Sequence, residues 1–259
     1  MLELETYKAA LDRYREYPIL AAWVGGSHSH GLADEYSDLD LRLIIQPSRE
    51  DILLGEADWT RSGHEPDITV MTPLAVLKRL LAGAPNLLEA LTLPESCILS
   101  DAGLLGELSR LSAGLTTYRT VDGALGNARS NLHQLESGRR FEERKRRKLM
   151  AETLRLLYSV DYVTGHEERG WPVQVSGYVP ELRKIKAEGT TLEALHDLLD
   201  QTTGNTARHA RPELSGYIRQ EATSMIVNLH AGVVEGRTFG TGMDTVKQGL
   251  EEFAKEKRQ

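Results

Sequence analysis

The sequence predicts an α+β protein: an N-terminal domain with a small mixed β-sheet, followed by a mostly α-helical C-terminal domain. Two observations support this division. Short apolar or alternating runs, which are typical of strands, occur in about the first 100 residues and nearly vanish afterwards. Beyond that point, apolar residues recur at helical spacing. We therefore expect one domain over residues 1–110 and a helical domain over residues 111–259.

The first elements are a helix and a buried strand. Apolar side chains recur on one face of residues 3–17, which predicts a helix. Pro18 ends that helix, because proline disfavours helical backbone at the residue before it. Residues 19–24 form a short apolar run that stops at Gly25-Gly26, so we expect a buried strand there.

Two further strands alternate with two helices. Residues 39–45 alternate between polar and apolar and then become wholly apolar, which predicts a second strand. Ser48 is placed to cap a helix over residues 49–54. Residues 66–71 predict a third strand, and Pro73 favours the start of the next helix.

The rest of the chain is predicted to be helical. Asn86 and Glu89 have the spacing of a capping box, so we expect Asn86 to cap a helix. Further helices are expected over residues 104–111, 118–135, 145–163, 192–199, 213–234 and 245–259.

Composition excludes several classes of protein. With 31 basic and 38 acidic residues the net charge is −7, which argues against a surface that binds nucleic acid everywhere but allows one local basic groove. A single cysteine, Cys97, cannot form an internal disulfide. The N-terminus lacks the pattern of a signal peptide, and no apolar stretch approaches the ~18 residues of a membrane span. We expect a cytoplasmic protein that does not bind membranes.

Two aspartates at the start of the second strand are the most informative residues. Side chains alternate along a strand, so Asp38, Asp40 and Arg42 share one face while the intervening leucines face the core. Neighbouring carboxylates repel each other and are costly unless a cation lies between them or each finds a hydrogen-bond donor. Their oxygens are the ligands that Mg²⁺ or Mn²⁺ prefers, and two such aspartates can bridge a pair of ions.

Two other segments add to this pattern. Asp67 begins the third strand and lies near Asp38 and Asp40 if the second and third strands pair, where it would serve as a metal ligand or a general base. Gly26 and Ser27 follow the first strand and offer backbone N–H groups and a hydroxyl for a triphosphate. Each piece alone has an ordinary alternative: a flexible turn, a solvated strand edge, or a strand start. Their combination is more specific.

This combination resembles the DNA polymerase β-type nucleotidyltransferase superfamily. The signature is a hydrophobic residue and Gly-Ser, followed by Asp-x-Asp, and it is matched here by Gly26-Ser27, Asp38 and Asp40. The superfamily's third carboxylate matches Asp67. Residues 37–42 and 83–91 are further similar to its RlaP branch, nucleotidyltransferases linked to RNA repair, with weaker similarity over residues 118–135 and 145–157.

The resemblance implies a fold, an activity and two cofactor ions. It implies a nucleotidyltransferase domain that transfers a nucleoside monophosphate from an NTP to a hydroxyl and releases pyrophosphate. Asp38, Asp40 and Asp67 would hold Mg²⁺ or Mn²⁺, and Gly26 and Ser27 would hold the phosphates. An RNA 3′ end, a small molecule and a protein side chain all remain open as acceptors, as does a non-catalytic nucleotide-binding module on the same fold.

Three basic residues are candidate nucleotide ligands, each with an alternative. Arg42 either meets a phosphate or forms an ion pair with Asp40. Lys148 and Arg155 lie two turns apart on one helical face and either bind the nucleotide or form an ion-pair ladder with Glu152 between them. They belong to or follow a run, residues 139–148, with seven basic and two acidic residues, which is either a solvated helix face or a place for a polyanion.

Overall fold

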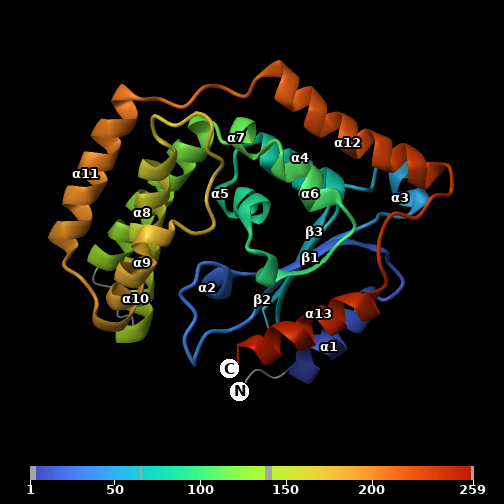
Figure 1. Ribbon diagram of the computed structural model, residues 1–259, viewed down its shortest axis with the longest axis horizontal. Coiled ribbons are helices and arrows are strands. Elements are labelled where there is room, and N and C mark those ends of the chain that lie inside the picture. Colours follow the sequence, from blue (N-terminus) through green and yellow to red (C-terminus); the bar gives the residue numbers. More distant parts are fainter. Residues whose placement is uncertain (1–3, 65, 138–141, 258–259) are drawn as a thin grey trace. The chain divides into compact units, whose positions relative to one another are not determined.

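The fold is α+β, as predicted. The computed structural model describes residues 4–64, 66–137 and 142–257, with a five-stranded mixed sheet and many helices (Figure 1). The chain divides into two compact units. We call residues 1–81, 93–111 and 216–259 the sheet unit, and residues 82–92 and 112–215 the helical unit.

This division differs from the predicted one in two places. A boundary does fall at residues 111/112, but residues 82–92 belong to the helical unit and residues 216–259 to the sheet unit. Within residues 216–259, α12 (Gly216–Val234) packs on α3 (Arg49–Leu54) and α4 (Pro73–Leu81). Helix α13 (Met243–Glu256) buries its apolar face in the core of the sheet. The apolar spacing of a helix shows that it buries a face but not which core receives it.

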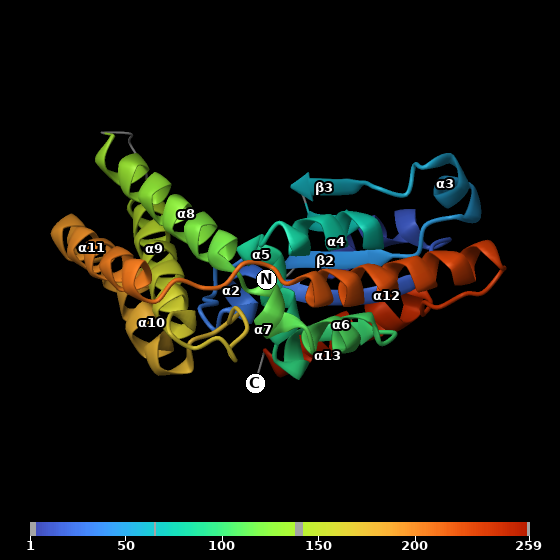
Figure 2. The same cartoon turned by 90° about the horizontal axis from the view of Figure 1, so that it is seen from above.

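The sheet has the strand order β3-β4-β2-β1-β5. Its strands are β1 (Ile19–Gly25), β2 (Asp40–Ile45), β3 (Thr60–His64), β4 (Asp67–Met71) and β5 (Ile98–Asp101). Strands β2 and β4 run parallel and the other pairs antiparallel, and Figure 2 shows β2 and β3 along their length. The three predicted strands are confirmed. Strand β3 escaped prediction because it is almost wholly polar and exposed, and β5 because it is only 4 residues long.

One face of the sheet forms the main core. Leu39, Leu41 and Leu43 are at most 1% exposed and face this core, as predicted. Helices α1 (Leu4–Leu11) and α13 pack against each other and cover this face, lying side by side in Figure 1. The predicted first helix is shorter than expected, since its last part is a 3₁₀ turn over Asp12–Tyr14.

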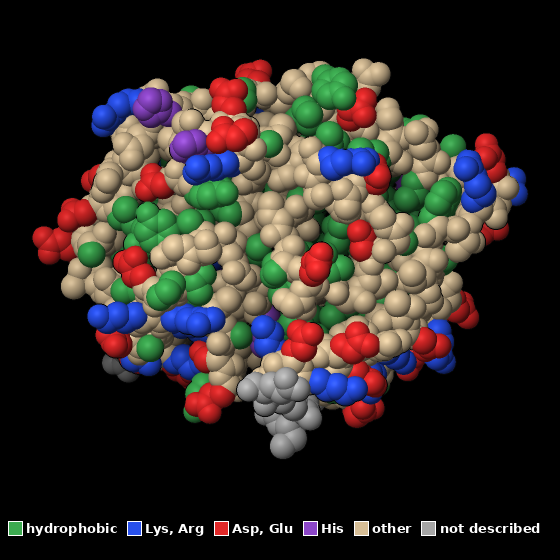
Figure 3. All heavy atoms as spheres, in the orientation of Figure 1, with side chains coloured by type: hydrophobic (Ala, Val, Ile, Leu, Met, Phe, Trp, Pro, Cys, Tyr) green, Lys and Arg blue, Asp and Glu red, His purple; other side chains and the backbone are tan. Residues whose placement is uncertain are grey.

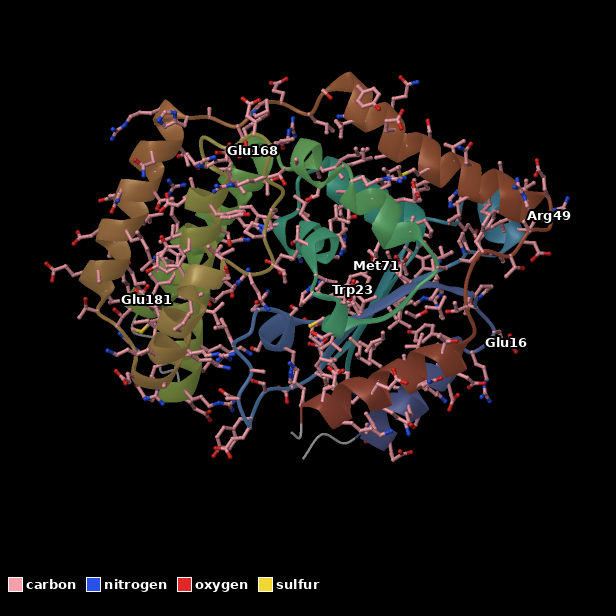
Figure 4. All side chains as sticks on the ribbon, in the orientation of Figure 1. Glu16, Trp23, Arg49, Met71, Glu168 and Glu181 are labelled. Carbon is pink, nitrogen blue, oxygen red and sulfur yellow. The ribbon has the colours of Figure 1, made fainter. Side chains whose placement is uncertain are left out.

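The opposite face of the sheet is apolar in its interior and charged at the end where β2 and β4 begin. Trp23 in β1 and Met71 in β4 are 2% and 1% exposed, and Figure 4 places both in the interior of the sheet unit. Arg42 is the partner of Trp23 in the register and so shares this face, but it is only partly buried. The face therefore passes from an apolar interior to a charged rim where β2 and β4 begin.

Short helices complete the sheet unit. Helix α2 (Gly26–Ser29) continues directly from β1. Helix α3 has the predicted cap, because the Ser48 hydroxyl accepts from the Asp51 backbone in a capping box. Helix α4 packs on β2, and α6 (Leu104–Ser109) packs on β1 and β5.

The helical unit is built around one long helix, α9 (Glu143–Val163), which packs on α8 (Tyr118–Glu136), α10 (Val179–Glu188) and α11 (Leu192–Arg208). Helix α10 was not predicted, because it buries only Leu182 and so lacks an apolar stripe. The predicted cap at Asn86 is wrong: Asn86 lies inside α5 (Pro85–Leu88), which begins after Ala84 with proline in its first turn. Helix α7 (Ser112–Leu115) is the remaining short helix of this unit.

The surface carries charged side chains of both signs, as expected from 31 basic and 38 acidic residues. Acidic and basic side chains are interspersed on the face seen in Figure 3. Among the residues that the structure describes, no helix combines the length and the apolar character needed to cross a membrane.

Candidate functional site

The two aspartate-bearing strands pair with each other, which is the condition under which Asp67 was expected near Asp38 and Asp40. Leu41 of β2 is the partner of Ile68 in the parallel β4, and both face the core. Asp40 and Asp67 each precede these residues by one position, so they lie on neighbouring strands, at the same edge and on the face away from the core. Asp38 lies two residues before Asp40, in the exposed segment that leads into β2. The parallel pairing thus brings the predicted carboxylates to one end of the sheet.

The glycine turn lies at the same end. Strand β1 is antiparallel to β2 and ends at Gly25, the partner of Asp40. Gly26 then turns the chain into α2 with a φ of +60°. A Cβ atom on Gly26 would lie 3.2 Å from the Asp40 Cβ and from its Oδ2. The chain can therefore pass this close to the Asp40 carboxylate only without a side chain, and Ser27 follows immediately.

We expect Gly26→Ala to destabilise the protein more than Gly55→Ala. Gly55 also has a positive φ, +76°, but nothing lies within 4 Å of its added Cβ. Both substitutions carry a left-handed backbone cost of about 1–2 kcal/mol, and Gly26→Ala adds about 1 kcal/mol for the contact with Asp40. Urea denaturation of the two variants measures the difference in the free energy of unfolding. Equal losses of unfolding free energy in the two variants would mean that a side chain at Gly26 makes no unfavourable contact with Asp40.

Asp40 is held by Arg42. The Arg42 guanidinium donates from Nε to Oδ1 at 3.2 Å and from Nη2 to Oδ2 at 2.9 Å, and both side chains are 21% exposed. Of the two interpretations of Arg42, the structure contains the ion pair with Asp40. Arg42 also lies beside the glycine turn, since a Cβ on Gly25 would be 3.1 Å from its Nε.

Asp67 lies in a crowded electrostatic environment. Its pKa is raised above the ordinary range, first by burial and then by the negative charge of Asp40, with a smaller contribution from Asp38. Arg42 and His64 act in the opposite direction. His64 is the partner of Asp67 across β3 and β4. Sequence reasoning missed His64 because it did not predict β3.

The donor chemistry at this edge fits a hard divalent cation. Carboxylate oxygens are the ligands that Mg²⁺ and Mn²⁺ prefer, and the mutual repulsion evident at Asp67 is what a cation relieves. A closed metal cage is not formed, however: over residues 4–64, 66–137 and 142–257, no three His, Cys, Asp or Glu side chains converge with metal-binding geometry. Arg42 donates to both oxygens of Asp40. Each carboxylate oxygen has a second lone pair, so a metal ion at Asp40 would either share the carboxylate with Arg42 or displace it.

Lys148 and Arg155 lie in the helical unit, both on α9. Lys148 is exposed. Arg155 is only 6% exposed and donates from Nη1 to Glu89 at 2.6 Å and from Nε and Nη2 to Glu152 at 2.8 and 2.7 Å. The structure thus contains the Glu152–Arg155 pair of the predicted ladder. Arg139 and Arg140, the first members of the basic run, lie outside the described residues.

Comparison with known protein families agrees with the motifs. A family model described as RlaP, RNA repair pathway DNA polymerase beta family, matches residues 3–234. The matched segment includes Gly26, Asp38, Asp40 and Asp67 as well as the whole of the helical unit. A search of curated proteins gave no match.

Proposed function

The chain belongs to the RlaP family, the polymerase β-type nucleotidyltransferases of RNA repair, and on this premise we propose that it transfers a nucleoside monophosphate from an NTP to a hydroxyl of RNA. One observation carries the proposal. The glycine turn after β1 meets the carboxylates of β2 and β4 at a single end of the sheet. Such a site can bind phosphate groups at the glycine turn and metal cations at the neighbouring carboxylates.

The glycine turn would bind the triphosphate. Backbone N–H groups at the start of α2 and the Ser27 hydroxyl are donors for phosphate oxygens, and the missing side chains at Gly25 and Gly26 allow close approach. Arg42 would leave Asp40 and donate to the phosphates, since a guanidinium binds phosphate as well as carboxylate. Both groups would hold the α phosphorus in line with the attacking hydroxyl.

The carboxylates would serve the reacting oxygens. Asp38, Asp40 and Asp67 would hold Mg²⁺ or Mn²⁺, which stabilises the charge on the phosphates when bound. The acceptor oxygen forms a bond to the α phosphorus, the bond from that phosphorus to the β-phosphate oxygen breaks, and pyrophosphate leaves. Asp67 would accept the proton of the attacking hydroxyl.

RNA is proposed as the acceptor on two grounds. The family that the chain belongs to is described as acting in an RNA repair pathway. The chain also carries a local run of basic residues, of which Arg144–Lys148 lie at the start of α9, and such a run is suited to phosphates despite the net charge of −7.

Label transfer tests the proposal. We expect one of the four α-labelled NTPs, with Mg²⁺ or Mn²⁺, to place its label on RNA, and the Asp38→Ala plus Asp40→Ala variant to lose this activity. Reactions without RNA provide the control. Label on the protein itself would indicate a protein acceptor instead. Nucleotide binding without transfer to RNA or protein would contradict RNA as the acceptor, leaving a small-molecule acceptor or a module without chemistry.

A further inference from the structure

Tyr7 places a buried hydroxyl beside the candidate site. It lies on α1, its side chain packs into the core under β2 and β4, and it is only 8% exposed. The apolar spacing of α1 accounts for an aromatic ring at this position, but a phenylalanine would satisfy that spacing equally well. Burying the hydroxyl is costly unless it is hydrogen-bonded. The hydrogen bonding of the Tyr7 hydroxyl therefore indicates its role.

The Tyr7 hydroxyl holds the segment that carries the first two carboxylates. It donates to the carbonyl oxygen of Leu39 at 2.7 Å, and Leu39 stands between Asp38 and Asp40. The Tyr7 side chain belongs to the same buried cluster as Ile68, the residue after Asp67, and Asp67 is near enough to act on the pKa of the hydroxyl. One side chain thus bonds to the backbone of the Asp-x-Asp motif and packs beside the start of β4.

This connection lies where the sheet itself provides little support. The register of β2 with β4 starts at Leu41 and Ile68. Leu39 precedes β2 altogether, so its carbonyl relies on contacts from outside the sheet. Asp38, one residue further out, is exposed. Without the Tyr7 hydroxyl, the main-chain segment that presents Asp38 and Asp40 would lose its hydrogen bond to a side chain that packs in the same core as Ile68 at the start of β4.

We propose that Tyr7 is a positioning residue that fixes the spacing of Asp38 and Asp40 relative to Asp67, an inference that rests on the proposed function of these carboxylates. Tyr7 touches neither the substrate nor the reacting atoms. It acts through the main chain, in the way that groups behind metal ligands orient those ligands.

The charge state of Tyr7 is compatible with this role. Burial raises the pKa of its hydroxyl, and the nearby negative charge of Asp38 raises it further. The hydroxyl therefore keeps its proton at neutral pH and remains a donor to the Leu39 carbonyl.

Tyr7→Phe tests the proposal, with Tyr14→Phe as the matched control. Tyr14 is a partly buried tyrosine that packs against the same core. The first measurement is the binding of Mn²⁺ by electron paramagnetic resonance, with the full chain and a non-hydrolysable α,β-methylene NTP analogue. We expect Tyr7→Phe to weaken Mn²⁺ binding by about tenfold, the usual effect of removing a group that orients metal ligands, and Tyr14→Phe to leave it unchanged.

Hydrogen exchange gives a second readout that needs no metal. We expect amide exchange in residues 38–41 and 67–68 to accelerate in Tyr7→Phe and not in Tyr14→Phe, because only the former loses the hydroxyl that holds Leu39 against the core shared with β4. Both measurements are made well below the unfolding temperature of each variant, so that global unfolding does not contribute. Equal behaviour of the two variants would overturn the role of Tyr7.

The outcomes separate this inference from the proposed function. If wild-type protein and the Asp38→Ala plus Asp40→Ala variant bind Mn²⁺ equally, or neither binds it, the proposed function fails. Hydrogen exchange still decides whether Tyr7 holds the two segments together. If Mn²⁺ binding depends on Asp38 and Asp40 but not on Tyr7, the carboxylates have their proposed function and Tyr7 does not position them.

Discussion

Asp40→Asn should reduce nucleotidyl transfer by about 10³-fold or more, the scale of loss when a residue central to the reacting charges is removed. Asp40 is the point at which the parts of the site meet. It faces Gly25 in β1, approaches the Gly26 turn, pairs with Arg42 and raises the pKa of Asp67. Asparagine keeps the shape of the side chain but removes its charge.

The matched control for this prediction is Asp58→Asn. Asp58 lies in the same unit and is also paired with a basic residue, Lys78, but it is away from the glycine turn. We expect its variant to retain activity. Chelation of divalent ions by EDTA should abolish transfer in wild-type protein to the same extent as Asp40→Asn.

Loss of folding would not explain the expected result. The Asp40–Arg42 pair is partly exposed, and pairs of this kind contribute about 1 kcal/mol or less. Thermal unfolding of Asp40→Asn should therefore stay close to that of wild-type protein. A variant that is well folded and still transfers nucleotide at the wild-type rate would show that Asp40 does not belong to the reacting centre.

Much of the sheet unit could be predicted because its central strands carry a strong pattern. β1 is wholly apolar, and β2 alternates between charged residues and leucines that face the core. Strand β3 has neither pattern, since a polar edge strand is stabilised by its backbone pairing with β4 and not by burial. The placement of residues 216–259 in the sheet unit depends on long-range packing that helical spacing does not encode.

The candidate site was predictable to the extent that it rests on strand geometry. Parallel pairing of two strands is enough to bring Asp67 beside Asp40. The bond from Tyr7 to Leu39 spans 32 positions, and in the sequence Tyr7 resembles any apolar residue of an amphipathic helix. Arg155 posed a different difficulty, because the same spacing with Glu152 suits a nucleotide ligand and an ion pair equally well.

Arg155→Met should destabilise the helical unit by about 3–5 kcal/mol, the usual cost of leaving a buried carboxylate, here Glu89, without its partner. Arg155 lies between Glu89, which is itself only 8% exposed, and Glu152 on the preceding turn of α9. The positive charge of Arg155 offsets the negative charges of Glu89 and Glu152. Burial acts to lower the pKa of Arg155, but the two carboxylates raise it above its ordinary value. Methionine fills most of the space but leaves Glu89 buried and uncompensated.

Arg129→Met is the matched control, since Arg129 is exposed and its bond to Thr203 is longer, at 3.3 Å. Its variant should change the free energy of unfolding by no more than about 0.5 kcal/mol. Urea denaturation, monitored by hydrogen exchange in α9, measures the free energy of unfolding of the helical unit in each variant. A triple variant, Glu89→Leu with Glu152→Leu and Arg155→Met, should recover most of the lost stability because no buried charge remains.

The same variants decide between the two interpretations of Arg155. An ion pair that holds α9 to the turn at Glu89 predicts a large loss of stability in Arg155→Met and its recovery in the triple variant. A nucleotide ligand predicts the reverse: stability close to wild type, with NTP affinity lost in both variants. The bonds to Glu89 and Glu152 occupy three of the guanidinium's donors inside the unit, so we expect the first result.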